Sequence, residues 1–313
     1  MSELVSILIP CHNAAPWLAQ TLESALAQTW PHTEIILIDD GSTDDSREIA
    51  RSFEARSVRV LTQPKRGASA ARNAGMREAR GGFIQFLDAD DLLTPDKIDG
   101  QVALLQQRGR DFVASCRWGR FGDVPSAARF VDQAVFRDFA PMDFLLLHVG
   151  ECRMMHPAAW LVPRDLAERA GGWNETLSLN DDGEYFARVV LASHGIVRSP
   201  VGAALYRSQL RDSLSRRRDP FALKSLVRSA ELIAGHMLHA ENTPRVRRAL
   251  ADYWQRLEYE LYPDAPEFRG RAAAEVRALG GSALQPEMGA RLRLLARLFG
   301  WKLARRIHRL LYP

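Results

Sequence analysis

The sequence predicts an α/β fold in which a mostly parallel central sheet is flanked by helices and followed by a helical C-terminal region. In the first hundred residues, short apolar runs alternate with segments whose apolar residues have helical spacing. From about residue 220 onward the strand-like runs disappear and helical patterns dominate. Short apolar strands joined by helices are typical of parallel sheets with both faces covered.

The N-terminal half supplies the strands of the expected sheet. The expected strands are residues 4–10, residues 34–44 together with the turn that ends them, residues 58–63 and residues 81–87. The expected helices between them are residues 15–29, 44–55 and 67–79, with Ser42 or Thr43 as the cap of the second. This alternation predicts that the strands run parallel, because each helix returns the chain to the same end of the sheet.

The remainder of the chain divides into a mixed segment and a helical segment. Between residues 100 and 220 we expect helices at 141–150 and 182–195, and short strands near 156–163 and 196–207. After residue 220, prolines near 263–266 and the glycine pair 280–281 interrupt helical patterns. We therefore expect one unit over residues 1–218 and a helical unit over residues 219–313.

Composition limits the class of protein. The 313 residues are 46% hydrophobic and 26% charged, with a formal net charge of +4, as in soluble globular proteins. Three widely spaced cysteines without a CxxC pair predict a reducing compartment and no disulfide framework. The N-terminus lacks a basic segment before its short apolar run, and no apolar stretch is long enough to span a membrane. We expect a cytoplasmic protein.

Polar clusters follow three of the expected strands. They are residues 11–13, 39–42 and 88–91. In open parallel sheets, ligands bind beyond the carboxyl ends of the strands. The sequence therefore predicts that these three clusters converge on one binding site.

The cluster Asp88-Ala89-Asp90-Asp91 places three carboxylates within four positions. One interpretation is the N-cap of a following helix. An EF-hand is excluded, because Leu92 and Leu93 stand where an oxygen ligand and a glycine are needed. The alternative that we favour is a site for Mg²⁺ or Mn²⁺, which bind few carboxylates and complete their shell with phosphate oxygens and water.

The cluster Asp39-Asp40-Gly41-Ser42 is either an ordinary turn with a capping serine or part of a nucleotide site. A carboxylate here can accept a hydrogen bond from a base or a ribose. Neither GxGxxG nor GxxxxGK[ST] occurs, which argues against dinucleotide and P-loop binding. The basic residues of PKRGASAARN can help to hold an anion at this edge; they are Lys65, Arg66 and Arg72.

Taken together, these stretches resemble the family 2 glycosyltransferases of GT-A fold. The matching segments are VSILIPCHN, LAQTW, EIILIDDGSTDDS, RGASAARNAGMREARGGFIQFLDADD, GGWNETL and NDDGEYFAR, over roughly residues 4–215. The resemblance implies an inverting transferase that uses a nucleotide diphospho-sugar, with a UDP-sugar favoured by family habit, and a catalytic unit over residues 1–218.

The resemblance also implies roles for individual residues. Asp90 is expected to bind the metal, with Asp88 on the metal or the ribose. The second carboxylate of the acidic pair at 181–182 is expected to be the catalytic base, so Asp182 is preferred and Asp181 is the alternative, because this pair has Asp in place of the family's first Glu. Both can also lie at the start of a helix. The residues expected around the nucleotide are Pro10, His12, Asn13, Asp40, Arg66, Arg72, Asp88, Ala89 and Arg211.

Arg207 and Arg211 belong to a basic segment that resembles the family's mobile loop over the diphosphate, and a solvated basic loop is the equal alternative. His156 is expected to be structural, and Trp173 either borders the acceptor pocket or fills core.

The C-terminal segment from Met288 is basic and amphipathic, with Lys or Arg between apolar residues and no acidic residue. One interpretation is peripheral contact with the inner face of the cell membrane, which suits a glycan or lipid-linked acceptor. The other is packing on the catalytic unit or on a second copy in a homodimer. We expect no nucleic-acid partner, because no recognised module accompanies the charge.

Two rival functions remain at the level of sequence. A sugar nucleotidyltransferase also uses aspartates and a divalent metal, but it releases pyrophosphate and usually has a glycine-rich basic N-terminal loop that is missing here. A non-catalytic nucleotide-sugar-binding module would retain the fold without the acidic pairs. Asp90 and Asp182 argue against such a module, and turnover of a donor would exclude it.

Overall fold

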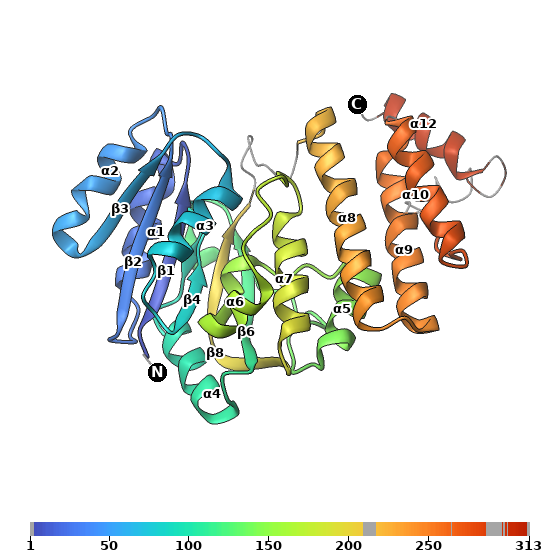
Figure 1. Ribbon diagram of the computed structural model, residues 1–313. Coiled ribbons are helices and arrows are strands. Elements are labelled where there is room, and N and C mark those ends of the chain that lie inside the picture. The colour runs from blue at the N-terminus through green and yellow to red at the C-terminus, as the bar shows by residue number, and fades with distance from the viewer. Residues whose placement is uncertain are drawn as a thin grey trace.

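The computed structural model describes residues 3–208, 217–263, 265–285, 296, 298 and 300–311. The strands are β1 (Val5–Cys11), β2 (Thr33–Asp40), β3 (Val58–Gln63), β4 (Phe83–Phe86), β5 (Leu92–Leu93), β6 (Phe112–Phe121), β7 (Trp160–Pro163) and β8 (Gly195–Arg207). The helices are α1 (Ala15–Leu26), α2 (Ser46–Ser52), α3 (Ala68–Glu78), α4 (Lys97–Arg108), α5 (Pro141–Gly150), α6 (Arg164–Ala170), α7 (Asp181–Ala192), α8 (Pro220–Ala240), α9 (Pro244–Leu261), α10 (Pro266–Ala278) and α12 (Trp301–Leu311). Figure 1 shows the sheet on one side of the molecule and helices α8–α12 on the other, with α7 between them.

Within the described residues, the strands form one sheet in the order β3-β2-β1-β4-β7-β6-β8-β5. Strands β1 to β4 pair in parallel, as the alternation of strand and helix predicted. Beyond β4 the sheet is mixed: β7 is antiparallel to β4 and β6, β8 is parallel to β6, and β5 is antiparallel to β8. The predicted α/β class is confirmed, and the parallel pattern holds best for the N-terminal half.

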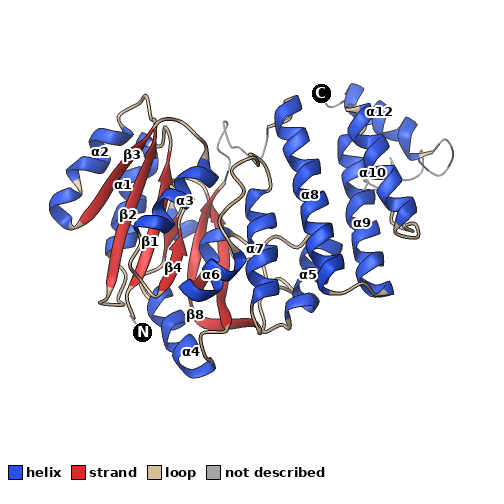
Figure 2. Ribbon diagram, viewed as in Figure 1, coloured by secondary structure: helices blue, strands red, loops and turns tan. Residues whose placement is uncertain are grey.

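Helices cover both faces of the parallel half, because crossover connections between parallel strands are right-handed. Helices α1 and α2 connect β1 to β2 and β2 to β3 in the same direction, so they lie on the same face. Helix α3 returns from β3 to the far side of β1 and therefore lies on the opposite face, where it packs on β1 and β2. Figure 2 shows these helices around the strands.

An aromatic cluster fixes α7 against the sheet. The Phe86 ring at the end of β4 lies 5.6 Å from that of Tyr185 and 5.1 Å from that of Trp173, measured between ring centroids. The rings of Trp160 and Phe186 stack at 5.3 Å. Such large rings bury much apolar surface and pack in preferred orientations. The cluster holds the N-terminal turn of α7 at the edge where β4 ends.

The C-terminal helices pack on this core and also form a smaller core of their own. Ile233 and Met237 of α8 and Val246 and Leu250 of α9 belong to the main cluster of buried residues. A second cluster joins α8, α9 and α10; its members include Trp254, Leu257, Leu261 and Ala272. Among the described helices, none is both long enough and apolar enough to cross a bilayer.

The observed elements differ from the expected ones in several places, and strand β5 and helix α6 were not expected. Strand β6 was not anticipated, and β7 is shorter than the segment 156–163 that suggested it. Helix α4 begins at Lys97 with Asp96 at its N-cap, so the cluster 88–91 does not cap it. The breaks expected near 263–266 and 280–281 separate α9 from α10 and end α10.

Candidate active site

The three polar clusters meet at one edge of the sheet, as predicted. Strands β2, β1 and β4 are neighbours, so their carboxyl ends lie side by side. The Asn13 backbone N–H donates to Ser42 Oγ at 3.0 Å, and the Thr43 N–H donates to Asn13 Oδ1 at 2.8 Å. His12 Nδ1 lies 2.9 Å from the Asp40 carbonyl oxygen. These bonds join the end of β1 to the turn after β2, and Pro10 is the buried residue of β1 just before them.

Asp40 organises the loop that follows β3. Its carboxylate accepts the backbone N–H groups of Arg66 and Gly67, both at 2.8 Å, and the Gln63 amide at 2.7 Å. Gly41 has φ +68°, and a Cβ there would lie 2.9 Å from the Lys65 nitrogen. Only glycine tolerates both the conformation and the approach. The loop at residues 64–67 is therefore what approaches Gly41 closely.

Arg72 connects two parts of the acidic edge. Its guanidinium, 7% exposed, donates to Asp88 Oδ1 at 2.8 Å and to Asp181 Oδ2 at 2.9 Å. Ser69 Oγ also donates to Asp181 Oδ2, at 2.8 Å. Burial opposes ionisation of Asp88, but the charges of Arg72 and His156 and the hydrogen bond from Arg72 together outweigh burial and lower the pKa of Asp88 below its usual value. The structure thus places Arg72 between the two carboxylates.

Asp91 is committed to structural contacts. Its Oδ1 accepts the Arg207 backbone N–H at 2.7 Å, and its Oδ2 lies 2.8 Å from His156 Nε2. Burial by itself would lower the pKa of His156, but the carboxylates of Asp91 and Asp88 outweigh burial and raise it. The Arg207 guanidinium is buried and donates to the Asp90 carbonyl at 2.8 Å. His156 and Arg207 therefore fix the turn that presents Asp90.

Asp90 is partly buried between the other two carboxylates of the sequence cluster. Burial, together with the charges of Asp91 and Asp88, raises the pKa of Asp90 to about 8. The neighbouring Ala89 is buried, and its carbonyl accepts the Thr21 hydroxyl at 2.9 Å. Three carboxylates held this close repel one another unless a cation neutralises them.

The residues at this edge fit a divalent cation. In the described part of the chain, Asp88, Asp91 and His156 offer ligand atoms within 4.8 Å of one another. Carboxylate oxygens suit Mg²⁺ and Mn²⁺. Within this cluster Asp91 and His156 also bind each other, and Asp90 is not one of its three residues.

The second acidic pair begins α7. Asp181 and Asp182 are its first residues, after Asn180 at the N-cap, where carboxylates also interact favourably with the helix dipole. Asp181 is bound by Arg72 and Ser69, whereas Asp182 lines a cavity of about 200 Å³. Burial and the charge of Asp181 raise the pKa of Asp182 to about 6. The two carboxylates therefore have different environments.

The cavity beside Asp182 has walls from segments that are far apart in the chain. Met154 and Met155 lie in the segment after α5, and Ile233 and Tyr253 come from α8 and α9. Trp173 is not among the lining residues: it is 3% exposed and stacks on Tyr185 at 4.2 Å between ring centroids. Trp173 fills core, which is one of its two expected roles.

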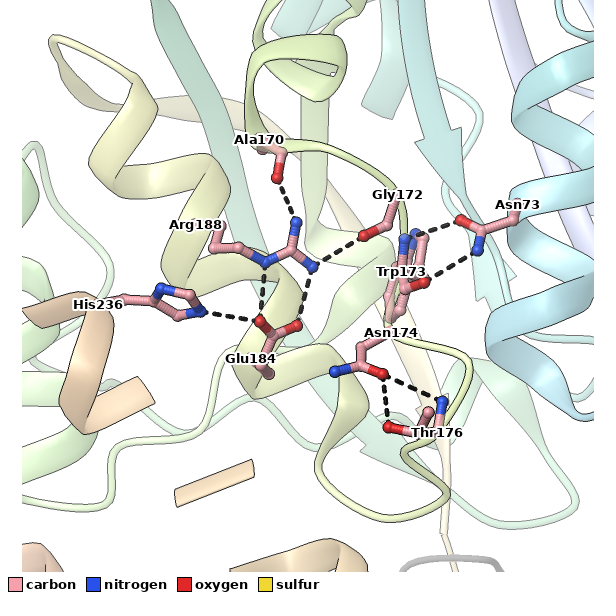
Figure 3. A network of polar contacts seen from close by, with 9 residues as sticks. All are labelled: Asn73, Ala170, Gly172, Trp173, Asn174, Thr176, Glu184, Arg188 and His236. Carbon is pink, nitrogen blue, oxygen red and sulfur yellow. Dashed lines mark hydrogen bonds and ion pairs between the residues drawn. The ribbon is translucent and has the colours of Figure 1, made fainter. Parts of the chain in front are cut away.

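A polar network holds the loop between α6 and α7 (Figure 3). Glu184 accepts two bonds of 2.8 Å from Arg188, whose guanidinium also donates to the carbonyls of Ala170 and Gly172. Across the loop, the Asn73 side chain pairs with both backbone groups of Trp173, at 2.7 and 2.9 Å. Arg66, which is largely exposed, reaches the same loop through an ion pair of 2.8 Å with Glu175.

The sequence did not assign roles to several residues that shape the edge. Ser69 and Glu184 stood in recognised segments without a role, and His156 was expected to be structural without a named partner. Their contacts join residues far apart in the chain, so spacing alone gave no signal. The predicted Arg211 lies outside the described residues.

Comparison with known proteins agrees with this geometry. The family described as Glycosyl transferase family 2 matches residues 6–167. Glycosyltransferase GlyG of Streptococcus pneumoniae serotype 4 is 30% identical over 289 residues, which cover 86% of this chain and 94% of that protein. The succinoglycan biosynthesis protein ExoU of Rhizobium meliloti is 31% identical over 300 residues, which cover 90% of this chain and 84% of ExoU.

Solved structures share the fold at low identity. S. aureus TarS 1-349 in complex with UDP-GlcNAc has a TM-score of 0.74 at 16% identity, covering 98% of this chain and 91% of that one. The mannosyltransferase PcManGT from Pyrobaculum calidifontis, in complex with GDP-Man and Mn²⁺, has a TM-score of 0.56 at 20% identity, covering 98% of this chain and 83% of its own. The sheet with its acidic edge is therefore that of a GT-A glycosyltransferase. The chain belongs to family 2 of the glycosyltransferases, as the sequence motifs suggested.

Proposed function

We propose that this glycosyltransferase moves a sugar from a nucleotide diphospho-sugar to an acceptor hydroxyl, with inversion at the anomeric carbon, in the synthesis of a surface polysaccharide. The observation that carries the proposal is that the two carboxylates at the start of α7, Asp181 and Asp182, have different environments. Arg72 binds Asp181, while Asp182 faces a cavity with its pKa raised to about 6. A carboxylate with that pKa is ionised at neutral pH and is a better base than an ordinary aspartate.

The nucleotide would lie at the ends of β1 and β2. Pro10, His12, Asn13 and Asp40 border this edge, and Arg66 with Ala89 flanks it. A UDP-sugar is the donor that we favour, since TarS of the same fold is in complex with UDP-GlcNAc and with UDP in its structures. Because PcManGT is in complex with GDP-Man, GDP-sugars are a second class of candidate donor.

Asp90 and Asp88 would hold Mg²⁺ or Mn²⁺ beside the diphosphate. When bound, such an ion neutralises the charge that develops on the leaving nucleoside diphosphate. Arg72 keeps Asp88 ionised and in place, and the contacts of Asp91 with His156 and Arg207 fix the turn around Asp90. These residues act by orienting the carboxylates before the donor arrives.

Asp182 would accept the proton of the attacking hydroxyl. A hydroxyl in the cavity beside Asp182 would attack the anomeric carbon on the face opposite the departing diphosphate, and one such displacement inverts the configuration. Asp181 is the alternative base, but its Oδ2 already accepts bonds from Ser69 and Arg72. We therefore assign proton transfer to Asp182.

The acceptor would enter through the same cavity. Its volume of about 200 Å³ is below the usual range of roughly 300–1,000 Å³ for sites that enclose a drug-sized ligand. It can therefore take the terminal unit of a glycan or lipid-linked acceptor rather than the whole molecule. ExoU is named for succinoglycan biosynthesis, and TuaG of Bacillus subtilis, 37% identical over 112 residues, for putative teichuronic acid biosynthesis.

Helix α12 would bring the enzyme to an anionic surface at the inner face of the membrane. Trp301 packs on Tyr259 and Tyr262, so this aromatic residue is engaged with the protein. Leu303 is 43% exposed, and Lys302 beside it is basic. Cosedimentation with phosphatidylglycerol vesicles tests the contact. Dimerisation without vesicle binding would instead favour packing between two copies.

The function is tested with a donor panel of UDP-, GDP- and dTDP-sugars, in Mn²⁺ or in EDTA, monitored for released nucleoside diphosphate. We expect one donor to turn over in Mn²⁺ and to stop in EDTA, and NMR of the product to show the inverted anomer. Release of pyrophosphate would point to a nucleotidyltransferase. Absence of turnover with every donor, in the presence of candidate glycan and lipid-linked acceptors, would support a binding module and would refute the proposal.

A further inference from the structure

One face of α8 carries polar side chains that contact the N-terminal end of α7. Ser225, Ser229 and His236 are separated by four and seven residues, spacings that place them on the same side of a helix. Ser225 and Ser229 are buried. A buried hydroxyl is stable only when it is hydrogen-bonded, so the partners of these side chains indicate what the face of α8 does.

Ser225 fixes the chain just before the acidic pair. Its Oγ accepts the backbone N–H groups of Ser178 and Leu179 at 2.8 and 3.0 Å, and its hydroxyl lies 3.2 Å from the Leu179 carbonyl, to which it can donate. One side chain of α8 therefore satisfies three backbone groups of the loop that leads into α7.

Ser229 holds the next residue, Asn180, in an unusual conformation. Asn180 has φ 57° and ψ 32°, the left-handed region that residues other than glycine adopt rarely and asparagine adopts more readily than most. Its side-chain amide lies 2.7 Å from Ser229 Oγ and 3.3 Å from Tyr253 Oη. A Cβ at Gly183 would overlap the Asn180 side chain, so this side chain packs directly on the first turn of α7.

His236 extends the contact along α7. Its Nε2 lies 3.0 Å from Glu184 Oε1, on the carboxylate that also binds Arg188 (Figure 3). Helix α8 therefore contacts α7 before and after the acidic pair. The strands that would carry the nucleotide, β1 and β2, lie on the other side of α7 from α8 (Figure 1).

We propose that α8 positions the catalytic base: Ser225 and Ser229 act through the backbone and through Asn180, and His236 acts through Glu184, to aim Asp182 at the acceptor. They are positioning residues, because none of them touches the reacting atoms. The inference rests on the proposed role of Asp182 and assigns part of the active site to the C-terminal unit. Loss of these contacts should slow transfer and leave nucleotide binding intact.

The test is a double-mutant cycle on Ser229→Ala and Asn180→Gly, in which glycine adopts the Asn180 conformation without its side chain. The readouts are kcat for hydrolysis of the donor that the panel identifies, its pH profile, and the Kd of UDP in Mn²⁺. We expect Ser229→Ala to lower kcat on the order of tenfold, to shift the acidic limb of the profile and to leave the Kd unchanged. In the Asn180→Gly background, Ser229→Ala should have no further effect.

Lys224→Ala is the matched control, because Lys224 is exposed on the same helix. Ser229→Cys, with similar volume and weaker hydrogen bonding, replaces Ser229→Ala if that variant does not fold. Unchanged kcat, equal losses of kcat and UDP affinity, or additive effects in the cycle would each overturn the inference. If Asp182→Asn abolishes turnover while Ser229→Ala leaves kcat unchanged, only the positioning role fails; if Asp182→Asn retains turnover, the proposed function fails first.

Discussion

Arg72 explains how carboxylates from distant parts of the chain share one buried edge. Asp88 follows β4 and Asp181 begins α7, yet both accept bonds from the same guanidinium. The Arg72 guanidinium also lies 4.3 Å from the centroid of the Trp173 ring. A planar cation with donors in a fixed fork can serve two carboxylates and a ring at once, which an ammonium cannot. Arg72 is therefore expected to be essential to stability as well as to the site.

Replacing Arg72 with Met should lower the free energy of unfolding by about 3–5 kcal/mol, because two largely buried carboxylates would lose their common partner. Arg72→Lys should recover only part of this loss. Urea unfolding followed by tryptophan fluorescence measures the change. The exposed ion pair of Arg56 with Glu23 supplies the control, and Arg56→Ala should have a much smaller effect. Equal effects of the two substitutions would contradict the bridging role.

Asp182 sets an expectation for the pH dependence of turnover. With its pKa raised to about 6, Asp182 is ionised above pH 6 and protonated below it, and only the ionised form accepts a proton. We expect kcat to fall roughly tenfold per pH unit below 6. Asp182→Asn should lower kcat roughly 10²–10⁴-fold and leave donor affinity unchanged.

Asp181→Asn is the informative comparison for this prediction. It loses the ion pair with Arg72 but keeps the proposed base, so the fall of kcat at low pH should persist. If the fall of kcat at low pH disappears in Asp181→Asn and persists in Asp182→Asn, then Asp181 is the base and Asp182 is not.

At the scale of elements, α7 is held from several directions. The aromatic cluster joins it to β4 and β7, α8 contacts its N-terminal end, and Arg188 ties it to the end of α6. Burial by itself would raise the pKa of Glu184, but its bonds from His236 and Arg188 lower it below the usual value. The helix that carries the acidic pair is thus kept in a fixed orientation.

Arg188→Met should destabilise the protein by about 3–5 kcal/mol, since Glu184 would keep a buried charge with fewer partners. Adding Glu184→Gln should restore part of the loss, because the neutral amide no longer needs the guanidinium. Thermal and urea unfolding of the single and double variants measure this coupling. If the double variant is less stable than Arg188→Met, the ion pair is not the main contribution of Arg188.

The elements that the sequence predicted well are those with local patterns. Strands β1 to β4 and helices α1 to α3 lie close to their expected positions, because an uninterrupted apolar run or a helical spacing is visible in a short window. Strand β6 was missed because Arg117, Gly119 and Arg120 interrupt its apolar pattern. Its pairing with β8 joins residues about eighty positions apart, which no local pattern reveals.

The candidate site shows the same limit. Asp90 and Asp182 were named from motifs, and the meeting of three clusters followed from the parallel sheet. The Asp91–His156 pair, the Arg72 bridge and the serines of α8 depend on distances between separate elements. Such contacts are set by tertiary packing, so sequence reasoning could name the residues without naming their partners.

At the scale of the whole molecule, the acidic edge lies where the sheet and the C-terminal helices meet. In the proposed mechanism, β1, β2 and β4 would bind the nucleotide, and the cavity bordered by α5, α7, α8 and α9 would admit the acceptor. The carboxylates at this junction repel one another in the absence of a cation, so the native state carries an electrostatic cost that ligands can relieve. Ligand binding should therefore be visible in the stability of the entire chain.

Mn²⁺ and UDP together should raise the melting temperature by about 3–5 °C at concentrations near 100 times Kd, which corresponds to about 2.7 kcal/mol. Each alone should give a smaller increase, because the cation bridges carboxylates and diphosphate, and EDTA should reverse the shift. Differential scanning fluorimetry measures the four conditions. Additive effects of Mn²⁺ and UDP would argue against a shared site.

Asp90→Asn tests whether Asp90 is the residue through which the ligands stabilise the protein, because its effect on the melting temperature should depend on whether Mn²⁺ and UDP are present. Without metal, Asp90→Asn should leave the melting temperature equal or higher, since burial and the charges of Asp91 and Asp88 disfavour ionised Asp90. With Mn²⁺ and UDP, the variant should lose most of the increase. A variant that is less stable without metal yet keeps the full increase would place the cation elsewhere and would make Asp90 a structural residue.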